Sequence, residues 1–567
     1  MTFEDRLDGW TRGARGPWLA ALIALLAALP GWFAMPVLDR DEARFAQASA
    51  QMLETRDFTS INFQAEPRFK KPIGIYWMQA LATSVTSSAE ARDIRSYRIP
   101  SLLGAALAAA TCAWGAAAMV RPGHAFLAGG LLATTILLST EGFIAKTDAM
   151  LCGLTTLSMA ALARTYLASR GQGPPIGRWV VPLFWVGMAG AILVKGPIAP
   201  MVVALTLVPL CLWDRDAKWL GALRWDWGLL AIVAAVGPWA MAITVTTDGG
   251  FWATAIGTDL APKLVGGQES HGAPPGYYTL LSPILMFPAC LLLPAAALVG
   301  WRGRNDPAVR FALCWLIPTW LLFELIPTKL VHYTLPVYGG AIWLMVLALR
   351  EPMGRVNRYL GAGILSLGGL ALAGAMLVVA QRYGSPLSVA QGVVAAILFL
   401  AAMILGGWFL IRRSAAKAVL SAGALATVAH AIAVGLIAPG LQPLWISEQL
   451  AQTVQTAHLD PRHDIVAGPI ALSGYAEPSA VFRLGTPLML TDTRGAITAL
   501  RTGRPAIVSA GEEATIRVAL PGLGPSAGEV TGLNYSDGRV RHLRLLRPLA
   551  TPPSAQPASR PSREPPP

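Results

Sequence analysis

The sequence predicts a polytopic α-helical membrane protein with a small α/β domain near its C-terminal end, and three observations support this fold class. Of the 567 residues, 54% are hydrophobic and 14% are charged, with a mean hydropathy of +0.50; a soluble domain has about 25% charged residues. Long runs such as 17–34 and 359–380 carry no charge, and about 17–25 apolar residues cross a bilayer as a helix. The charges gather instead in 37–98 and in the C-terminal region. These observations exclude a cytosolic globular enzyme.

Thirteen apolar stretches are predicted to span the membrane, and the charges of their loops indicate the orientation. Lys and Arg accumulate on the cytoplasmic side of membrane proteins. With the N-terminus inside, most loop cations fall inside, and the short outer loops carry only Lys146, Lys195, Lys263, Lys329 and Arg382. The net charge of +13 therefore indicates orientation rather than nucleic-acid binding. The spans are expected near 17–36, 99–119, 124–140, 149–168, 179–194, 197–213, 228–247, 276–299, 310–326, 334–349, 359–380, 389–411 and 418–439.

An odd number of spans places the first polar loop and the C-terminal region on the same, extracytoplasmic side. We expect a transmembrane domain over 1–439 and, within it, a first periplasmic loop at 37–98 with interfacial helices. Segment 72–88, which holds Tyr76, Trp77 and several Thr and Ser residues, is expected to lie at the membrane surface. A periplasmic α/β domain is expected over 440–550, followed by a disordered Pro/Ser-rich tail at 551–567.

Short β-type runs between turns marked by Gly and Pro predict the strands of the α/β domain. These runs are 464–472, 479–482, 487–490, 506–509 and 543–546.

Ionisable residues at the outer ends of the spans form a candidate site. Asp41 and Glu42 begin a predicted helix, where acids either cap the helix or take part in chemistry. The other members are Lys70 and Lys71 before the interfacial segment, Lys146 and Asp148 at the start of a span, Lys195 in a tight turn, and Lys329, His332 and Tyr333 in the loop IPTKLVHY. Charges at membrane depth are costly and usually functional. Cations at this level suit a lipid phosphate, and a carboxylate among them can serve as a general base.

The reaction that such a site could perform is a group transfer from a donor delivered by the membrane. The sequence holds no GxxxxGK[ST] phosphate loop, and polyprenyl-phosphate sugars are the obvious class of activated donor. A lipid or sugar transporter or flippase is the alternative of a different class; it would predict paired broken helices and an internal repeat. A receptor or scaffold would explain the C-terminal domain but not the charges at the span ends.

Eight motifs in order resemble the signature of membrane glycosyltransferases related to aminoarabinose transferase and protein O-mannosyltransferase. The motifs are DRDEARFAQASAQMLETRDF, RFKKPIGIYWMQA, RIPS, KTDAM, LVKGP, GPWA, HGAPPGYY and PTKLVHYTLP. The resemblance implies a GT-C fold, a location in the bacterial inner membrane, and transfer of a sugar from undecaprenyl phosphate to a periplasmic acceptor. Lipid A or another envelope glycolipid is the expected acceptor, and protein O-glycosylation is the alternative. The expected partners are the donor, a lipid or glycan acceptor and membrane lipids, and not nucleic acid.

The resemblance also implies roles for single residues. Asp41 would be the catalytic base or would orient the acceptor, Asp148 matches a second acidic position, and Glu42 beside Asp41 is the third catalytic candidate. Candidates for substrate binding are Arg44, Lys70, Lys71, Lys195, His271, Lys329, His332 and Tyr333. In aminoarabinose transferases an acid before the Lys-Pro pair and a loop histidine can share a metal, but this chain has Lys70 at that position. The substitution argues against a divalent metal, and no cofactor is otherwise implied.

Overall fold

The computed structural model describes residues 3–262 and 272–549 of the chain. Lys263, His271 and the tail at 551–567, which the sequence analysis names, lie outside these residues. The chain divides into two compact units, Met1–Leu441 and Gln442–Pro567. We describe each unit by itself.

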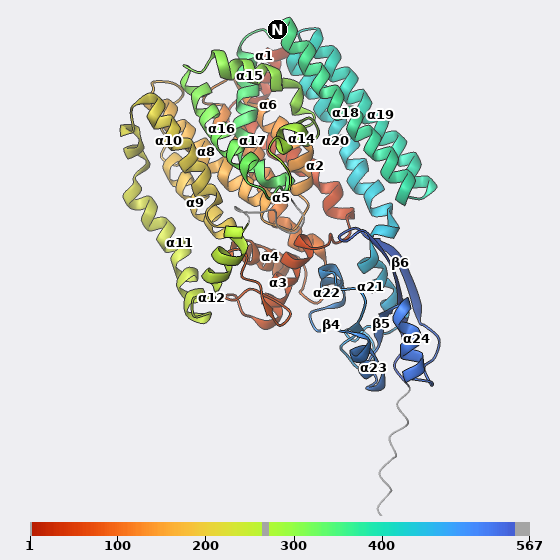
Figure 1. The fold of residues 1–567 in the computed structure, drawn as a ribbon. Helices are drawn as coiled ribbons and strands as arrows, with labels where there is room; N and C mark the ends of the chain where they lie inside the picture. Colours follow the sequence, from red (N-terminus) through yellow and green to blue (C-terminus); the bar gives the residue numbers. More distant parts are fainter. Residues whose placement is uncertain (1–2, 263–271, 550–567) are drawn as a thin grey trace, which may run out of the picture. The chain divides into compact units, whose positions relative to one another are not determined.

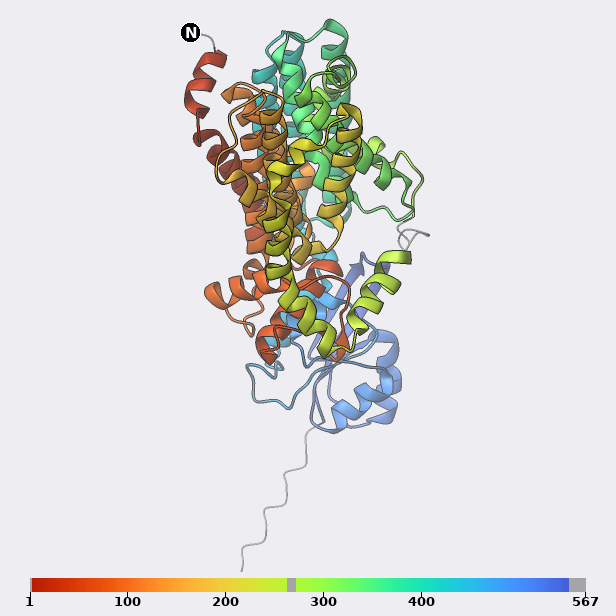
Figure 2. The same ribbon diagram turned by 90° about the vertical axis from the view of Figure 1, so that its left-hand side faces the viewer.

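The first unit is a bundle of helices with one small hairpin among its described residues (Figures 1 and 2). Its two longest helices, α18 and α19, pack side by side, and α20 packs against α19. The helices are α1 (Phe3–Thr11), α2 (Arg15–Ala34), α3 (Asp41–Thr55), α4 (Gly74–Thr86), α5 (Ile94–Ala116), α6 (Pro122–Thr134), α7 (Ile136–Glu141), α8 (Asp148–Ser169), α9 (Val180–Lys195), α10 (Ile198–Asp214), η1 (Lys218–Leu223), α11 (Trp225–Thr246), α12 (Gly250–Trp252), η2 (Ala253–Leu260), α14 (Tyr277–Leu285), η3 (Ala289–Leu292), α15 (Leu293–Arg302), α16 (Pro307–Leu325), η4 (Val331–Val337), α17 (Tyr338–Leu347), η5 (Ala348–Arg350), α18 (Arg355–Tyr383), α19 (Pro386–Ile411), α20 (Ala415–Ile432), η6 (Ala433–Ile437) and η7 (Ala438–Gly440).

The chain is a membrane protein with several spans. Among the described residues, nine helices are long and apolar enough to cross a bilayer, or ten if the bent pair formed by Tyr277–Leu285 and Ala289–Arg302 is one span. Two further predicted spans form the shorter apolar helices α9 and α10, of 16 and 17 residues. The predicted span 124–140 is divided at Thr135, whose hydroxyl accepts a hydrogen bond from the Leu138 amide and begins α7. The count of thirteen spans therefore stays a prediction.

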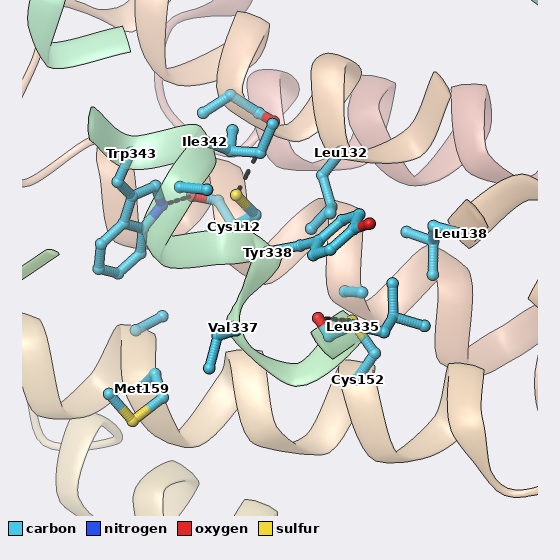
Figure 3. Close-up of a cluster of buried hydrophobic side chains, with 14 of the residues drawn as sticks. Cys112, Leu132, Leu138, Cys152, Met159, Leu335, Val337, Tyr338, Ile342 and Trp343 are labelled. Atoms are coloured by element: carbon cyan, nitrogen blue, oxygen red, sulfur yellow. Dashed lines mark hydrogen bonds between the residues drawn. The ribbon is translucent and has the colours of Figure 1, made fainter. Parts of the chain in front are cut away.

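The core of the bundle lies where α17 packs near α5 and α8. Figure 3 shows Trp343 and Tyr338 of α17, both with no exposed surface, together with Cys112 and Cys152. The indole N–H of Trp343 donates to the Cys112 carbonyl at 3.0 Å, so this polar group is satisfied inside the core. All five cysteines of the chain are free.

The predicted first loop begins with helix α3 and continues through a hairpin into helix α4. The hairpin pairs β1 (Asn62–Phe63) with β2 (Glu66–Pro67). Helices α3 and α4 lie together at one end of the bundle, and α1 lies at the other end (Figure 1). We call this region the α3 end of the bundle. Helix α4 has 13 residues and is not among the helices that pass the length and hydropathy test for a span.

The second unit is a small α/β domain, as the sequence predicts. Its sheet has the strand order β4-β3-β5-β7-β6, in which β4, β3 and β5 are parallel and β7 and β6 are antiparallel. The elements are η8 (Gln442–Leu444), α21 (Ile446–Thr456), β3 (Ala471–Leu472), α22 (Pro478–Leu484), β4 (Met489–Leu490), α23 (Thr493–Arg501), β5 (Ala506–Ser509), α24 (Ala510–Ala519), β6 (Gly528–Asn534) and β7 (Arg539–Leu546).

Three details of this domain differ from the prediction. The run 479–482 is not a strand but the middle of helix α22, because Pro478 occupies the first helical position, where its missing N–H costs nothing. Strand β6, over Gly528–Asn534, was not predicted. The long run predicted at 464–472 contributes only two strand residues, Ala471 and Leu472.

Candidate functional site

Asp148 and Lys195 form an ion pair near the α3 end of the bundle. Asp148 is the first residue of α8 and is buried, and its Oδ1 accepts from the ammonium of Lys195, the last residue of α9. The Lys195 side chain keeps 12% of its surface exposed. Its ammonium lies 5.7 Å from the centre of the Tyr333 ring, a cation–π distance. One side of this lysine is therefore held by protein, and the other is open to a ligand.

A second lysine joins the pair to two further buried groups. The Lys146 ammonium lies 2.9 Å from Glu141 Oε1 and 3.6 Å from Asp148 Oδ2. It also lies 3.1 Å from Nδ1 of His332. All four side chains, Glu141, Lys146, Asp148 and His332, are buried. We call these four residues, together with Lys195, the charge cluster.

The carboxylates of the charge cluster keep Lys146 charged. Burial alone would lower its pKa, but the nearby carboxylates of Glu141 and Asp148 raise the pKa above the ordinary value for a lysine. The charge of Asp41 acts in the same direction. Asp41 is exposed at the start of α3, so a ligand can reach it directly.

Two anchors hold the loop that carries Lys146. The side chain of Glu42 accepts a hydrogen bond from the Ala145 amide at 2.8 Å. The hydroxyl of Ser101 donates to the carbonyls of Ile144 and Lys146, at 2.6 and 3.1 Å. The loop is therefore tied to both α3 and α5.

Two glycines allow the chain segments that carry Lys195 and Lys71 to lie close to the charge cluster. Gly196 has a φ of +61° and ends α9 directly after Lys195, a conformation that residues with a Cβ rarely adopt. A Cβ on Gly74 would lie 2.8 Å from the carbonyl carbon of Leu193, so only glycine lets α4 pack this closely against α9. This contact places Lys71, just before α4, near the end of α9. The charge of Lys71 acts on His332.

Two of the predicted site residues, Glu42 and Lys329, make contacts that favour a structural role. Glu42 is fully paired: Arg98 binds both of its oxygens at 2.8 Å, and the Leu38 and Ala145 amides donate to them. Lys329 caps the end of α16, where its ammonium donates to the carbonyls of Phe323, Glu324 and Ile326. A lysine ammonium has three donors, so Lys329 has none left for a substrate. We therefore assign both residues to the scaffold.

The other predicted residues lie at the border of the cluster or outside it. Arg44 follows Asp41 on α3 and is partly buried, and Lys70 is exposed beside Lys71, whose ammonium donates to the Lys70 carbonyl at 3.0 Å. His271 lies outside the described residues. Sequence reasoning missed Glu141, which follows the predicted span 124–140 by one residue. The sequence does contain an indication of its role: Glu141 is a single carboxylate at the end of an apolar run, where a charge is costly and usually functional.

Three members of the cluster have the chemistry of metal ligands. Single ligand atoms of Glu141, Asp148 and His332 lie within 4.8 Å of one another. Two carboxylates and an imidazole can bind zinc or manganese. The Lys146 ammonium contacts all three side chains, however, so in this structure a cation of the protein itself takes that place.

Comparisons with known proteins confirm the resemblance to membrane glycosyltransferases. Residues 33–247 match the profile of the family described as dolichyl-phosphate-mannose-protein mannosyltransferase. Two curated relatives carry the name undecaprenyl phosphate-alpha-4-amino-4-deoxy-L-arabinose arabinosyl transferase. The protein of Pseudomonas paraeruginosa is 29% identical over 347 residues, which are 60% of this chain and 61% of the relative. That of Pectobacterium carotovorum is 27% identical over 395 residues, 66% of this chain and 68% of the relative.

Solved structures establish the fold. ArnT from Cupriavidus metallidurans in the apo state superposes with a TM-score of 0.73 at 17% identity, covering 94% of this chain and 98% of that chain. The same protein bound to undecaprenyl phosphate gives a TM-score of 0.71 at 17% identity and covers 93% and 97% of the two chains. The GT-C fold that the resemblance implied is therefore confirmed.

Proposed function

We propose that this protein transfers a sugar from undecaprenyl phosphate to an acceptor on the periplasmic side of the bacterial inner membrane, with lipid A or another envelope glycolipid as acceptor. The observation that carries the proposal is the Lys195–Asp148 pair, a partly exposed ammonium held by a buried carboxylate. The names of the relatives support this class of donor. Because the match spans only 61% of the first relative, the activity is our proposal.

The residues support a displacement at the anomeric carbon of the sugar. A bond forms between the acceptor oxygen and this carbon, while the bond from the carbon to the phosphate oxygen breaks and the polyprenyl phosphate leaves. Lys195, with Lys71 near it, would stabilise the negative charge on the leaving phosphate, because fixed cations in a poorly hydrated pocket stabilise developing charge strongly. Asp148 acts as the positioning residue that aims the Lys195 ammonium.

Asp41 would act on the acceptor. It is exposed and lies close enough to Lys146 for its charge to act there. If the acceptor is a hydroxyl group, Asp41 takes its proton as the new bond forms. If the acceptor is a phosphate of lipid A, which is already ionised, no proton needs to move and Asp41 only orients it.

The test supplies the purified full-length protein with undecaprenyl phosphate-α-4-amino-4-deoxy-L-arabinose and lipid A, and follows both by mass spectrometry. We expect lipid A to gain the mass of the sugar while undecaprenyl phosphate is released. A matched sample carrying Lys195→Met should leave the donor intact. If the wild-type protein consumes neither this donor nor another polyprenyl-phosphate sugar, the proposal is wrong.

Protein O-glycosylation is the second candidate, because residues 33–247 match a family of protein mannosyltransferases. Mass spectrometry of lipids and envelope proteins, from cells with and without the gene, separates the two candidates. A sugar lost only from envelope proteins in the deleted strain favours this second function.

A further inference from the structure

The charge cluster contains a cation that the proposed transfer reaction does not use directly. Lys146 points to the centre of the cluster and contacts Glu141 at 2.9 Å, His332 at 3.1 Å and Asp148 at 3.6 Å. These are the three side chains that could otherwise hold a metal ion. A buried ammonium among three potential metal ligands needs an explanation, because burying a charge is expensive.

Lys146 contacts its neighbours at the distances expected of a hydrogen-bonding ammonium. Zinc holds its nitrogen and oxygen ligands at about 2.0–2.2 Å, whereas charged N–H donors bind oxygen at about 2.7–2.9 Å. The 2.9 Å contact of Lys146 to Glu141 lies in this range, and its 3.1 Å contact to Nδ1 of His332 is a longer hydrogen bond.

The contact with Lys146 determines which nitrogen of the His332 ring carries a proton. An ammonium has only donors, so Nδ1 of His332 must accept the hydrogen bond from Lys146 and carries no proton. The proton of the neutral ring is then on Nε2, which faces Asp148 Oδ2 at 3.7 Å. The ring therefore contacts both the Lys146 ammonium and Asp148, at the carboxylate oxygen that Lys195 does not bind.

Glu141 is the carboxylate that fits no other role. It is 3% exposed, one of its oxygens binds Lys146, and its other oxygen, Oε2, is buried with no hydrogen-bond partner among the described residues. A carboxylate in this state is stable only beside a cation. Ser101 and Glu42 anchor the backbone at Lys146 and Ala145, so the loop that carries the ammonium is held beside Glu141.

We propose that Lys146 is a built-in cation in a latent metal site, with Glu141 and His332 as the positioning residues that hold it beside Asp148. For its part in sugar transfer this inference rests on the proposed function. There, Lys146 and Lys195 bind Asp148 from two sides and offset its charge, so that an anionic phosphate can approach without a divalent metal. Removing the ammonium while leaving its space should convert the cluster into a true site for a divalent cation.

The experiment uses the full-length protein in detergent and Mn²⁺ alone as the probe, with the free ion followed by electron paramagnetic resonance. We expect Lys146→Gly, which empties the space, to bind Mn²⁺ where the wild-type protein does not. Adding Glu141→Gln to Lys146→Gly should weaken this binding by about tenfold or more, as loss of a group that supports a metal does. Lys146→Met is the matched control: it removes the charge but fills the space, and it should gain no site.

Three results would overturn the inference. The first is Mn²⁺ binding by the wild-type protein that Glu141→Gln removes. The second is a Lys146→Gly protein that elutes and melts as a folded protein but binds no Mn²⁺. The third applies even if Lys146→Gly does not fold: sugar transfer by the wild-type protein that stops with a chelator and returns with Mn²⁺. The binding measurements need no sugar donor, so they separate a failure of this inference from a failure of the proposed function.

Discussion

Arg98 and Glu42 form a bidentate ion pair in which neither side chain is exposed to solvent. Both the Nε–Oε1 and the Nη2–Oε2 distances are 2.8 Å, and Arg98 also donates to the carbonyls of Met35 and Pro36 at 2.7 and 2.9 Å. The same carboxylate holds the amide of Ala145. This pair therefore joins α3 and α5 to the loop that carries Lys146.

Breaking this pair should destabilise the protein strongly. Loss of one partner leaves the other charge buried and alone, which costs about 3–5 kcal/mol. We expect Glu42→Ala to lower the melting temperature of the purified protein, as measured by thermal unfolding in detergent. Arg95→Ala removes the partner of Asp93 in an exposed pair at 2.8 Å, and such pairs contribute about 0–1 kcal/mol. Equal melting temperatures for the two variants would contradict the buried role.

Lys195→Met should impair transfer without unfolding the protein. Losing a fixed group that stabilises charge in a transition state costs about 10²–10³ in rate. The measurement is kcat/KM with the undecaprenyl-phosphate sugar. Lys218→Met, at an exposed lysine in η1, serves as the control and should leave the rate unchanged. A Lys195→Met enzyme as fast as the control would remove this lysine from the site.

Asp41→Asn should distinguish the two kinds of acceptor. With a hydroxyl acceptor the rate should fall by about 10²–10⁴, the usual contribution of a general base. With a phosphate acceptor the loss should be far smaller, because no proton is transferred. Single-turnover rates with both acceptors provide the measurement, and Glu66→Gln, at an exposed acid of the nearby hairpin, is the control. A large and equal loss with both acceptors would refute the role as base.

Lys329→Met should affect stability and not substrate binding. Its ammonium caps three carbonyls at the end of α16, and leaving such buried acceptors unsatisfied costs about 1–3 kcal/mol. We expect a lower melting temperature with an unchanged KM for the donor. A raised KM at an unchanged melting temperature would return Lys329 to the substrate site.

The stability of the C-terminal domain should fall in acid because of Glu513. Although burial works to raise the pKa of Glu513, hydrogen bonds from Arg544 and Arg517 hold it below its ordinary value. A carboxylate with a lowered folded-state pKa stabilises the protein above its unfolded-state pKa, about 4.3, and this stabilisation is lost as the pH falls through the folded-state pKa.

Thermal unfolding of the full-length protein at several pH values tests this. The wild-type protein should melt above Glu513→Gln at pH 7, and the difference should shrink below about pH 4.3. A difference that stays constant down to the most acidic pH would show that ionisation of Glu513 contributes nothing.

The sequence predicted most of the fold and four of the five residues of the charge cluster, all except Glu141. Asp148, Lys195 and His332 could be found because each lies at the end of an apolar run, where a charge is conspicuous. Asp41 and Glu42 could not be separated by sequence: they are adjacent, but one is exposed and the other faces Arg98, which is far away in the chain. Such a difference depends on tertiary packing.

Short elements were predicted less well, for a different reason. An apolar run such as 479–482 fits a strand and a helix equally, and here Pro478 favours the helix. Strand β6 has glycine at Gly528 and Gly532, which hides its alternating pattern. Its pairing with β7 decides its conformation instead.

The charge cluster also bears on how the bundle is assembled. Glu141, Asp148 and Lys195 come from the ends of α7, α8 and α9, and His332 comes from η4, nearly 200 residues after Glu141 in the chain. Until η4 has docked, the Lys146 ammonium lacks the acceptor that Nδ1 of His332 provides, and a charge with an unmet hydrogen bond is costly away from water. The residues of the charge cluster thus favour the native arrangement over partly assembled ones. The same residues serve both the chemistry of the site and the cooperativity of folding.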